Sequence, residues 1–127
     1  MFEIKVKTEF EAAHRIEGYK GKCNRRQGHS WGVESCAAGK KLDELGMLVD
    51  FKEVKHAANE ILDAMDHQYL NELPAFQNGY NPTAEHIAKY VYDALAEHAV
   101  FQGHAKLQSI RVWESPKSSV VYSRDED

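Results

Sequence analysis

Residues 2–10 alternate between apolar and polar side chains. The apolar positions share even numbers and are Phe2, Ile4, Val6 and Phe10. A period of two residues predicts a strand with one buried face. We expect the strand to continue to His14, which keeps the even parity. A second strand is predicted over 29–37, where Trp31 and Val33 are in phase with His29.

From residue 51 the apolar positions follow the 3.6-residue period of a helix. The pattern predicts an amphipathic helix from Phe51 to about Met65, with Asp50 as its N-cap. A second helix is predicted over 81–98, with Asn81 as its cap and Pro82 at its first helical position. The expected buried stripes are Phe51, Val54, Ala57, Ala58, Ile61, Leu62 and Met65 on the first helix, and Ala84, Ile87, Ala88, Val91 and Leu95 on the second.

Two strands close the chain, over 107–114 and 119–123, and the stretch 115–118 joins them. The resulting order is β-β-α-α-β-β. This order predicts an α+β fold in which a four-stranded antiparallel sheet carries two helices on one face. The chain of 127 residues is expected to form a single domain, 1–127.

Composition narrows the classes of function. The net charge of −4 argues against a nucleic-acid-binding protein. No apolar run approaches the ~18–20 residues of a membrane span, and the alternating N-terminus does not read as a signal peptide, so we expect a cytoplasmic protein. Cys23 is expected to be reduced, as is Cys36, which we place in the core. Four basic residues lie within positions 20–26, namely Lys20, Lys22, Arg25 and Arg26. These residues either lie in a solvated loop or attract an anionic small molecule to this part of the protein.

Three residues suggest a metal site with one weak position. His14 comes from the first strand, and Gln27 and His29, two residues apart, should point to one side of the second. Three imidazoles and a water are a common arrangement around catalytic zinc. Here the amide of Gln27 stands in the third position, and an amide oxygen is a poor zinc ligand. Two histidines in separate segments are also common without a metal.

Other residues offer acid–base chemistry. Basic neighbours would lower the pKa of Cys23 and make it a thiolate base, although a loop cysteine without a role fits the same position. Asp66 beside His67 can hold the tautomer of the imidazole, a weak signal by itself. Glu114 ends a strand, where its carboxylate is either solvated or paired with a guanidine-like N–H edge.

Taken together, these residues resemble the 6-pyruvoyl-tetrahydropterin synthase family, and most closely its bacterial 6-carboxytetrahydropterin synthases of queuosine biosynthesis. The resemblance covers nearly the whole chain. It rests on FEAAHR (10–15), the cysteine followed by Gly-His (23–29), LGMLVDF (45–51), MDHQYLN (65–71), NPTAEHIA (81–88) and VWES (112–115).

The resemblance implies a tunnelling fold, assembled as a homohexamer of two trimers with active sites between subunits. It also implies a zinc-dependent lyase that converts 7,8-dihydroneopterin triphosphate to 6-carboxytetrahydropterin, acetaldehyde and triphosphate. Zn²⁺ would be held at the positions of His14, Gln27 and His29. Cys23 would be the base, His67 with Asp66 the acid–base partner, and Glu114 the anchor of the pterin ring. Lys22 and Arg25 are candidates for binding the triphosphate.

The chain departs from the family's Leu-His-Gly-His, since it reads Arg26-Gln27-Gly28-His29. Three interpretations follow for the metal. Gln27 supplies its oxygen in a weak site, the Cys23 thiolate fills the position, or the metal is absent and the chain is a pterin-binding relative with little turnover. A 6-pyruvoyl-tetrahydropterin synthase activity is the alternative within enzymes.

Overall fold

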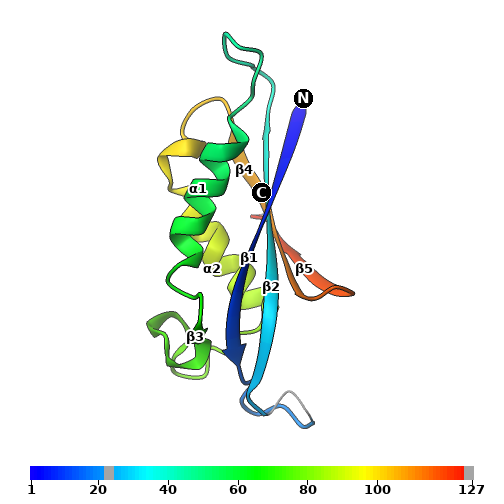
Figure 1. Ribbon diagram of the computed structural model, residues 1–127, viewed down its shortest axis with the longest axis vertical. Helices are drawn as coiled ribbons and strands as arrows, with labels where there is room; N and C mark the ends of the chain where they lie inside the picture. Colours follow the sequence, from blue (N-terminus) through cyan, green and yellow to red (C-terminus); the bar gives the residue numbers. More distant parts are fainter. Residues whose placement is uncertain (22–24, 125–127) are drawn as a thin grey trace.

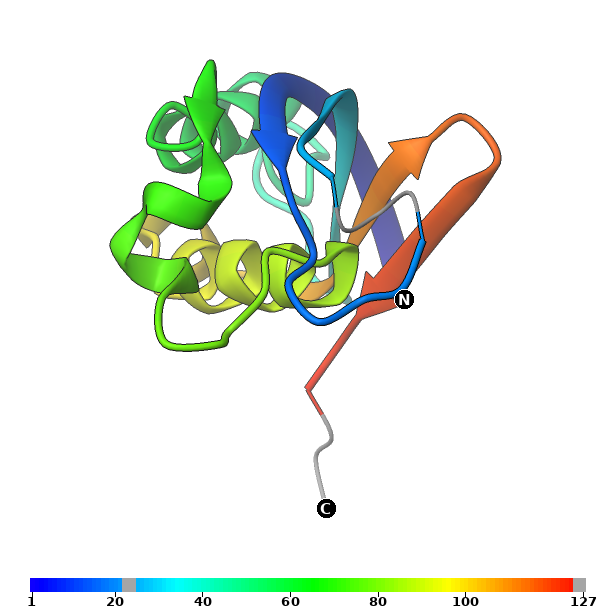
Figure 2. The same ribbon diagram turned by 90° about the horizontal axis from the view of Figure 1, so that it is seen from below.

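The fold joins a sheet to two helices and a few short 3₁₀ turns. The computed structural model describes residues 1–21 and 25–124. The strands are β1 (Phe2–His14), β2 (Gln27–Gly39), β3 (Gln68–Tyr69), β4 (Lys106–Ser115) and β5 (Ser118–Tyr122). The helices are α1 (Phe51–Leu62) and α2 (Ala84–Ala96). Figure 1 shows that both helices lie on the same side of the sheet, and Figure 2 shows this from below.

The sheet has the order β3-β1-β2-β4-β5. The four long strands pair antiparallel, as the sequence predicts. The prediction of a purely antiparallel, four-stranded sheet is nevertheless wrong. The two-residue strand β3 pairs parallel with β1, where Ala12 and Ala13 lie opposite Gln68 and Tyr69. This extra strand brings the segment after α1 against the end of β1.

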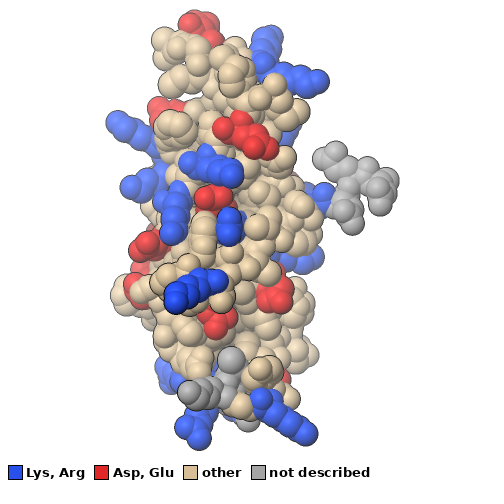
Figure 3. Space-filling view, turned by 90° about the vertical axis from the view of Figure 1, so that its right-hand side faces the viewer, with Lys and Arg blue, Asp and Glu red and all other residues tan. Residues whose placement is uncertain are grey.

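The two faces of the sheet differ in burial. On the face toward the helices, Phe10 is 2% exposed and Trp31 and Val112 are fully buried. They pack with Leu62 of α1 and Val91 of α2 in one core cluster. Residues of the opposite parity face away from the helices, and Figure 3 shows that lysine, arginine and acidic side chains intermingle there. We call this side the open face of the sheet.

The residues at the start of each helix can be compared with the predicted N-caps. Asp50 caps α1 by accepting a hydrogen bond from the backbone N–H of Lys52 (2.8 Å), as predicted. The predicted cap of α2 is wrong, because Thr83 is the N-cap and accepts from the backbone N–H of His86 (3.1 Å). The side chain of Asn81 is instead bonded to the backbone of Glu17. Phe51 is also misplaced by the prediction, since it is 60% exposed.

The remaining buried positions follow the predicted helical stripes closely. Val54, Ala57, Ala58 and Leu62 of α1 are buried, and Met65 is buried just beyond the helix. Ile87, Ala88, Val91 and Leu95 are buried on α2, joined by Tyr92. None of the helices in the described ranges is long and apolar enough to cross a membrane.

Candidate active site

The ends of β1 and β2 bring the predicted metal ligands onto one face. His14 lies directly opposite Gln27 in the antiparallel register, and Ala12 lies opposite His29. Directly paired residues point to the same side, and so do residues two apart on one strand. All these side chains therefore face the helices. The rings of His14 and His29 meet edge to face with their centroids 5.0 Å apart.

Trp31 supports both imidazoles from the same face. Its ring centroid is 4.9 Å from that of His14 and 5.3 Å from that of His29, in both cases nearly perpendicular. Its indole Nε1 donates a hydrogen bond to the backbone carbonyl of Ala12 (3.2 Å). Because the tryptophan is fully buried, its ring cannot swing away, and the two imidazoles are held close together.

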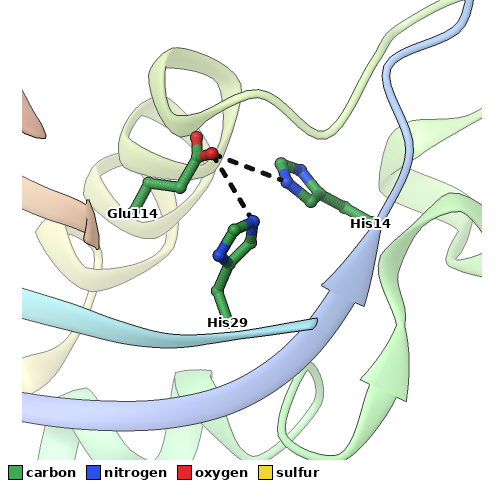
Figure 4. Close-up of side chains that lie close together, drawn as sticks. All are labelled: His14, His29 and Glu114. Carbon is green, nitrogen blue, oxygen red and sulfur yellow. Dashed lines mark ion pairs between the residues drawn. The ribbon is translucent and has the colours of Figure 1, made fainter. Parts of the chain in front are cut away.

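The third member of the cluster is Glu114, near the end of β4 (Figure 4). Its Oε1 lies 3.5 Å from Nε2 of His29 and 3.9 Å from Nε2 of His14. Zinc bonds of about 2.0–2.2 Å place tetrahedral donor atoms roughly 3.3–3.5 Å apart. The three donor atoms, all within 4.8 Å of one another, thus need only small movements to surround one ion.

Hydrogen bonding fixes which nitrogen of His14 is a donor. Its Nδ1 lies 2.8 Å from the backbone carbonyl oxygen of Pro82, and a carbonyl only accepts, so Nδ1 carries the proton. Nε2 is then the basic nitrogen, and it is the one aimed at Glu114. A metal-bound histidine is commonly oriented in this way, by a carbonyl on its other nitrogen.

His29 presents a buried nitrogen that lacks a hydrogen bond. Nε2 of His29 is shielded from solvent and, among the described residues, makes no hydrogen bond. At 3.5 Å the Glu114 carboxylate is within ion-pair distance but does not satisfy the nitrogen. Burial lowers the pKa of His29, Glu114 opposes the shift, and His14 adds to it. A neutral imidazole with an unsatisfied buried nitrogen suits a metal ion, and two histidines with a glutamate are a known zinc set.

The structure adds one candidate to the expected ligand set. Gln27 lies on the face of His14 and His29, and Glu114 forms with these two histidines a group that could hold a metal ion. The parity of Glu114 with the buried Ile110 and Val112 does place it on the face of the imidazoles. Its distance from His29 depends on the β2–β4 register, which includes a bulge near Cys36 and has no sequence signature.

The side chains of Asp66 and His67, the predicted acid–base pair, lie in contact. Nδ1 of His67 lies 3.0 Å from Oδ2 of Asp66. Oδ1 of Asp66 accepts a hydrogen bond from the backbone N–H of Glu11 (2.9 Å), and this bond, with those from His67, lowers the pKa of Asp66. The Asp66 carboxylate therefore holds the proton of His67 on Nδ1 and leaves Nε2 as the basic nitrogen. His67 is 76% exposed at its side chain, so Nε2 is accessible.

A pocket of about 430 Å³ lies across β1, β2 and β3. Its lining residues are Glu11, Ala12, Ala13, Arg26, Gly28, His29, Ser30, His67, Gln68 and Tyr69. By strand parity, Glu11, Ala13, Gly28 and Ser30 belong to the open face, whereas the side chain of His29 points to the helices. We call this cavity the β1–β3 pocket. His29 of the metal-ligand cluster and His67 both line this pocket.

Two asparagines join the segment after β1 to later parts of the chain. Asn71 lies in the 3₁₀ turn after β3, and Asn81 lies in the loop before α2. The amide of Asn71 accepts from the backbone N–H of Arg15 and donates to the carbonyl of the same residue, both at 2.8 Å. Asn81 does the same with Glu17, at 3.1 and 3.0 Å. Each side-chain amide thus forms the same pair of hydrogen bonds that the backbone of a neighbouring strand would form. These two clamps keep Pro82 beside His14.

Comparison with known proteins agrees with this geometry. Residues 3–125 match the family described as 6-pyruvoyl tetrahydropterin synthase. The chain belongs to the 6-pyruvoyl tetrahydropterin synthase family. Its members include a putative 6-carboxy-5,6,7,8-tetrahydropterin synthase of Archaeoglobus fulgidus, 39% identical over 74% of this chain and 76% of that protein. The 6-carboxy-5,6,7,8-tetrahydropterin synthase of Synechocystis is 33% identical over 96% of this chain and 93% of its own length.

Solved structures of the family share the fold. The 6-pyruvoyl tetrahydropterin synthase of Caenorhabditis elegans superposes with a TM-score of 0.83 at 26% identity, over 98% of this chain and 96% of that one. The synthase of Plasmodium falciparum has a TM-score of 0.75 at 17% identity, over 97% of each chain, which shows the fold alone. The resemblance seen in the sequence motifs to this synthase family is confirmed.

The other predicted site residues have different outcomes. Cys23 and Lys22 lie outside the described residues, so their roles stay predictions. Arg25 is exposed, and the β1–β3 pocket includes Arg26 but not Arg25 in its lining. Cys36 is 5% exposed, and burial raises the pKa of its thiol, in keeping with the predicted core position.

Proposed function

We propose that the protein is a 6-carboxytetrahydropterin synthase that acts on 7,8-dihydroneopterin triphosphate in queuosine biosynthesis. The products would be 6-carboxytetrahydropterin, acetaldehyde and triphosphate. One structural observation carries the proposal. Although Gln27 replaces a family histidine, two imidazoles and a carboxylate still converge, with Nε2 of His29 buried and without a hydrogen bond. Relatives with that name, matched over most of their length, support the same activity.

His14, His29 and Glu114 would hold Zn²⁺ as a two-histidine, one-carboxylate centre. When bound, the ion would acidify side-chain hydroxyls of the substrate and stabilise enolate-like charge. Both imidazoles approach Oε1 of Glu114, which leaves Oε2 for the pterin N–H edge. Glu114 can therefore anchor the ring, its predicted role, while its other oxygen takes the place of the missing imidazole.

His67 would move protons in the reaction. Asp66 keeps the proton on Nδ1, so Nε2 of His67 can accept a proton from the substrate side chain and return it later. Cys23 would act as the thiolate base on the other side of the reacting carbon. Lys22 and Arg25 would attract the triphosphate to the loop.

The proposed assembly is a homohexamer built from two trimers, with pterin as the small-molecule partner and the cytoplasm as the setting. In this assembly the active sites would lie between subunits. The supporting feature is the edge of the sheet. β5 ends the sheet with an unpaired edge, which a neighbour's strand can extend. Light scattering should give six times the 14.5 kDa chain mass, and a monomer would contradict the assembly.

A product assay tests the activity. The purified protein is incubated with 7,8-dihydroneopterin triphosphate, acetaldehyde is trapped by an NADH-coupled alcohol dehydrogenase, and the pterin is identified by mass spectrometry. Acetaldehyde with 6-carboxytetrahydropterin is the expected result. A dithiol-sensitive pyruvoyl product without acetaldehyde would assign the 6-pyruvoyl activity. Tight pterin binding without any product would make the chain a pterin-binding protein.

A further inference from the structure

Arg26 lies in a defined place beside the β1–β3 pocket. Its guanidinium carbon is 4.2 Å from the centroid of the Tyr69 ring, so the group stacks on the aromatic face. Within the described part of the chain, no carboxylate forms an ion pair with Arg26. Stacking uses the face of a guanidinium and leaves its N–H edge free to donate. Among the described residues, Arg26 is thus a cation whose donors are not taken up by a carboxylate.

The floor of the pocket beside Arg26 is open. Gly28 lies opposite Ala13, and Ala13 lies opposite Tyr69, so two small residues follow the tyrosine across the sheet. A Cβ atom added at Gly28 would meet nothing within 4 Å. The backbone there is not in the left-handed region. Neither close packing nor backbone geometry requires glycine at this position, and its effect is to leave space in the cavity.

Glu11 is the one acidic side chain among the described lining residues of the pocket. The hydroxyl of Ser30 donates to both carboxylate oxygens of Glu11, at 2.8 and 2.7 Å. The negative group of the pocket is thus held by Ser30. Among the described lining residues, Arg26 is the one lysine or arginine. His67, the proposed proton carrier, lines the same cavity.

We propose that Arg26 is a phosphate-binding residue that holds the phosphate chain of the substrate over the space at Gly28, beside His67. Tyr69 is its platform. The inference rests on the proposed function for the identity of the phosphate ester, but the anion site itself does not depend on turnover. Arginine suits the role because its planar fork donates two parallel hydrogen bonds to one phosphate.

Calorimetric titration tests the site without catalysis. The probes are inorganic tripolyphosphate, neopterin triphosphate, which has an oxidised ring, and neopterin without phosphate. Replacing Arg26→Gln should weaken both phosphate probes about tenfold to a hundredfold, the range for losing a hydrogen bond to a charged group. Neopterin binding should not change. Arg111→Gln is the matched control, because Arg111 also stacks on an aromatic ring, at 4.7 Å from Trp113, but lies outside the pocket.

Gly28→Val is the second variant, and it fills the open space instead of removing the charge. Valine suits a strand, and this side chain points away from the imidazoles, so the melting temperature and metal content should be preserved. Phosphate binding should fall at least tenfold. Unchanged affinity in Arg26→Gln, equal losses in Arg26→Gln and Arg111→Gln, or no tripolyphosphate binding by the parent protein would each overturn the proposal. If phosphate binding depends on Arg26 but no pterin product forms, the site stands and the synthase proposal fails.

Discussion

Glu114 and His29 come from different strands, and their side chains meet with Oε1 3.5 Å from Nε2. The Nε2 nitrogen of His29 is buried, and no group of residues 1–21 or 25–124 gives it a hydrogen bond. The carboxylate also faces His14. Two imidazoles and a carboxylate thus meet around Nε2 of His29. This is the geometry expected where a metal ion binds between the three side chains.

The first prediction concerns the carboxylate. Glu114→Gln should reduce zinc affinity by more than the roughly 10–100-fold lost when a residue that hydrogen-bonds to a metal ligand is removed, because an amide replaces a charged ligand. Zinc per chain after dialysis against a competing chelator measures this. The control is Glu34→Gln, which removes a charge from the open face of β2. If Glu114→Gln keeps its zinc but binds pterin weakly, Glu114 serves the substrate alone.

A second prediction concerns the position where the family has an imidazole. Gln27→His should raise zinc affinity, because Gln27 lies opposite His14 and on the face of His29. A third imidazole would bind more tightly than an amide. Competition with a chromophoric chelator gives the affinity of each protein. Equal affinities would show that position 27 does not reach the ion.

The third prediction tests whether the two proposed proton carriers serve catalysis and not the stability of the fold. Cys23→Ala and His67→Asn should each lower turnover by about 10²–10⁴-fold, the range of general acid–base catalysis. Asparagine is chosen at 67 because the backbone φ there is 59°, a conformation that asparagine tolerates better than alanine. Light scattering should show the parent's assembly in both variants. Full turnover in Cys23→Ala would exclude its role as base.

The fourth prediction is a dependence of stability on pH. The pKa of Asp66 is lowered in the folded protein, so its carboxylate stabilises the fold above its ordinary pKa of about 3.9, and this contribution is lost as the pH falls through the folded-state value. Asp66→Asn keeps an acceptor for the Glu11 N–H but has no charge. The difference in unfolding free energy between the two proteins should shrink below about pH 4. Urea denaturation across this range measures it, and a constant difference would contradict the assignment.

The fifth prediction concerns the clamps. Asn71→Ala removes both hydrogen bonds to the backbone of Arg15, and at about 0.5–1.5 kcal/mol for each bond this should cost about 1–3 kcal/mol of unfolding free energy. Asn59→Ala on α1 is the control and should change it by no more than about 0.5 kcal/mol. Chemical denaturation gives both values. Equal effects would show that the clamp contributes nothing specific.

The sequence predicts most of the elements because their apolar periods are long. Thirteen residues of β1 alternate clearly, and both helices repeat their stripe over three turns. β3 was missed because two residues carry no period. The cap of α2 was assigned to Asn81, which has the right side chain, but its amide is bonded to Glu17, and Thr83 takes the position. The local preference of asparagine for a helix cap is thus outweighed by a hydrogen bond to a residue 64 positions away in the chain.

In the site, too, some relationships can be predicted from the sequence and others cannot. The parity of strands predicts that His14, Gln27 and His29 share a face, and adjacency in the chain is enough to predict the Asp66–His67 pair. The meeting of Glu114 with His29 requires the register between β2 and β4, and the orientation of His14 requires the carbonyl of Pro82. These relationships join distant segments, so a single sequence does not encode them in any local pattern.

The hydrogen bond from His14 to Pro82 bears on when the protein can acquire its ion. The proposed donor atoms come from positions 14, 29 and 114, and the carbonyl that orients the first comes from position 82. A growing chain on the ribosome can pair β1 with β2 early, but it lacks both the orienting carbonyl and the carboxylate until β4 has been synthesised. Metal uptake at the complete site would therefore follow synthesis, and a bound ion would fasten the N-terminal hairpin to the C-terminal one. Removing the ion should loosen the earliest and the latest parts of the chain together.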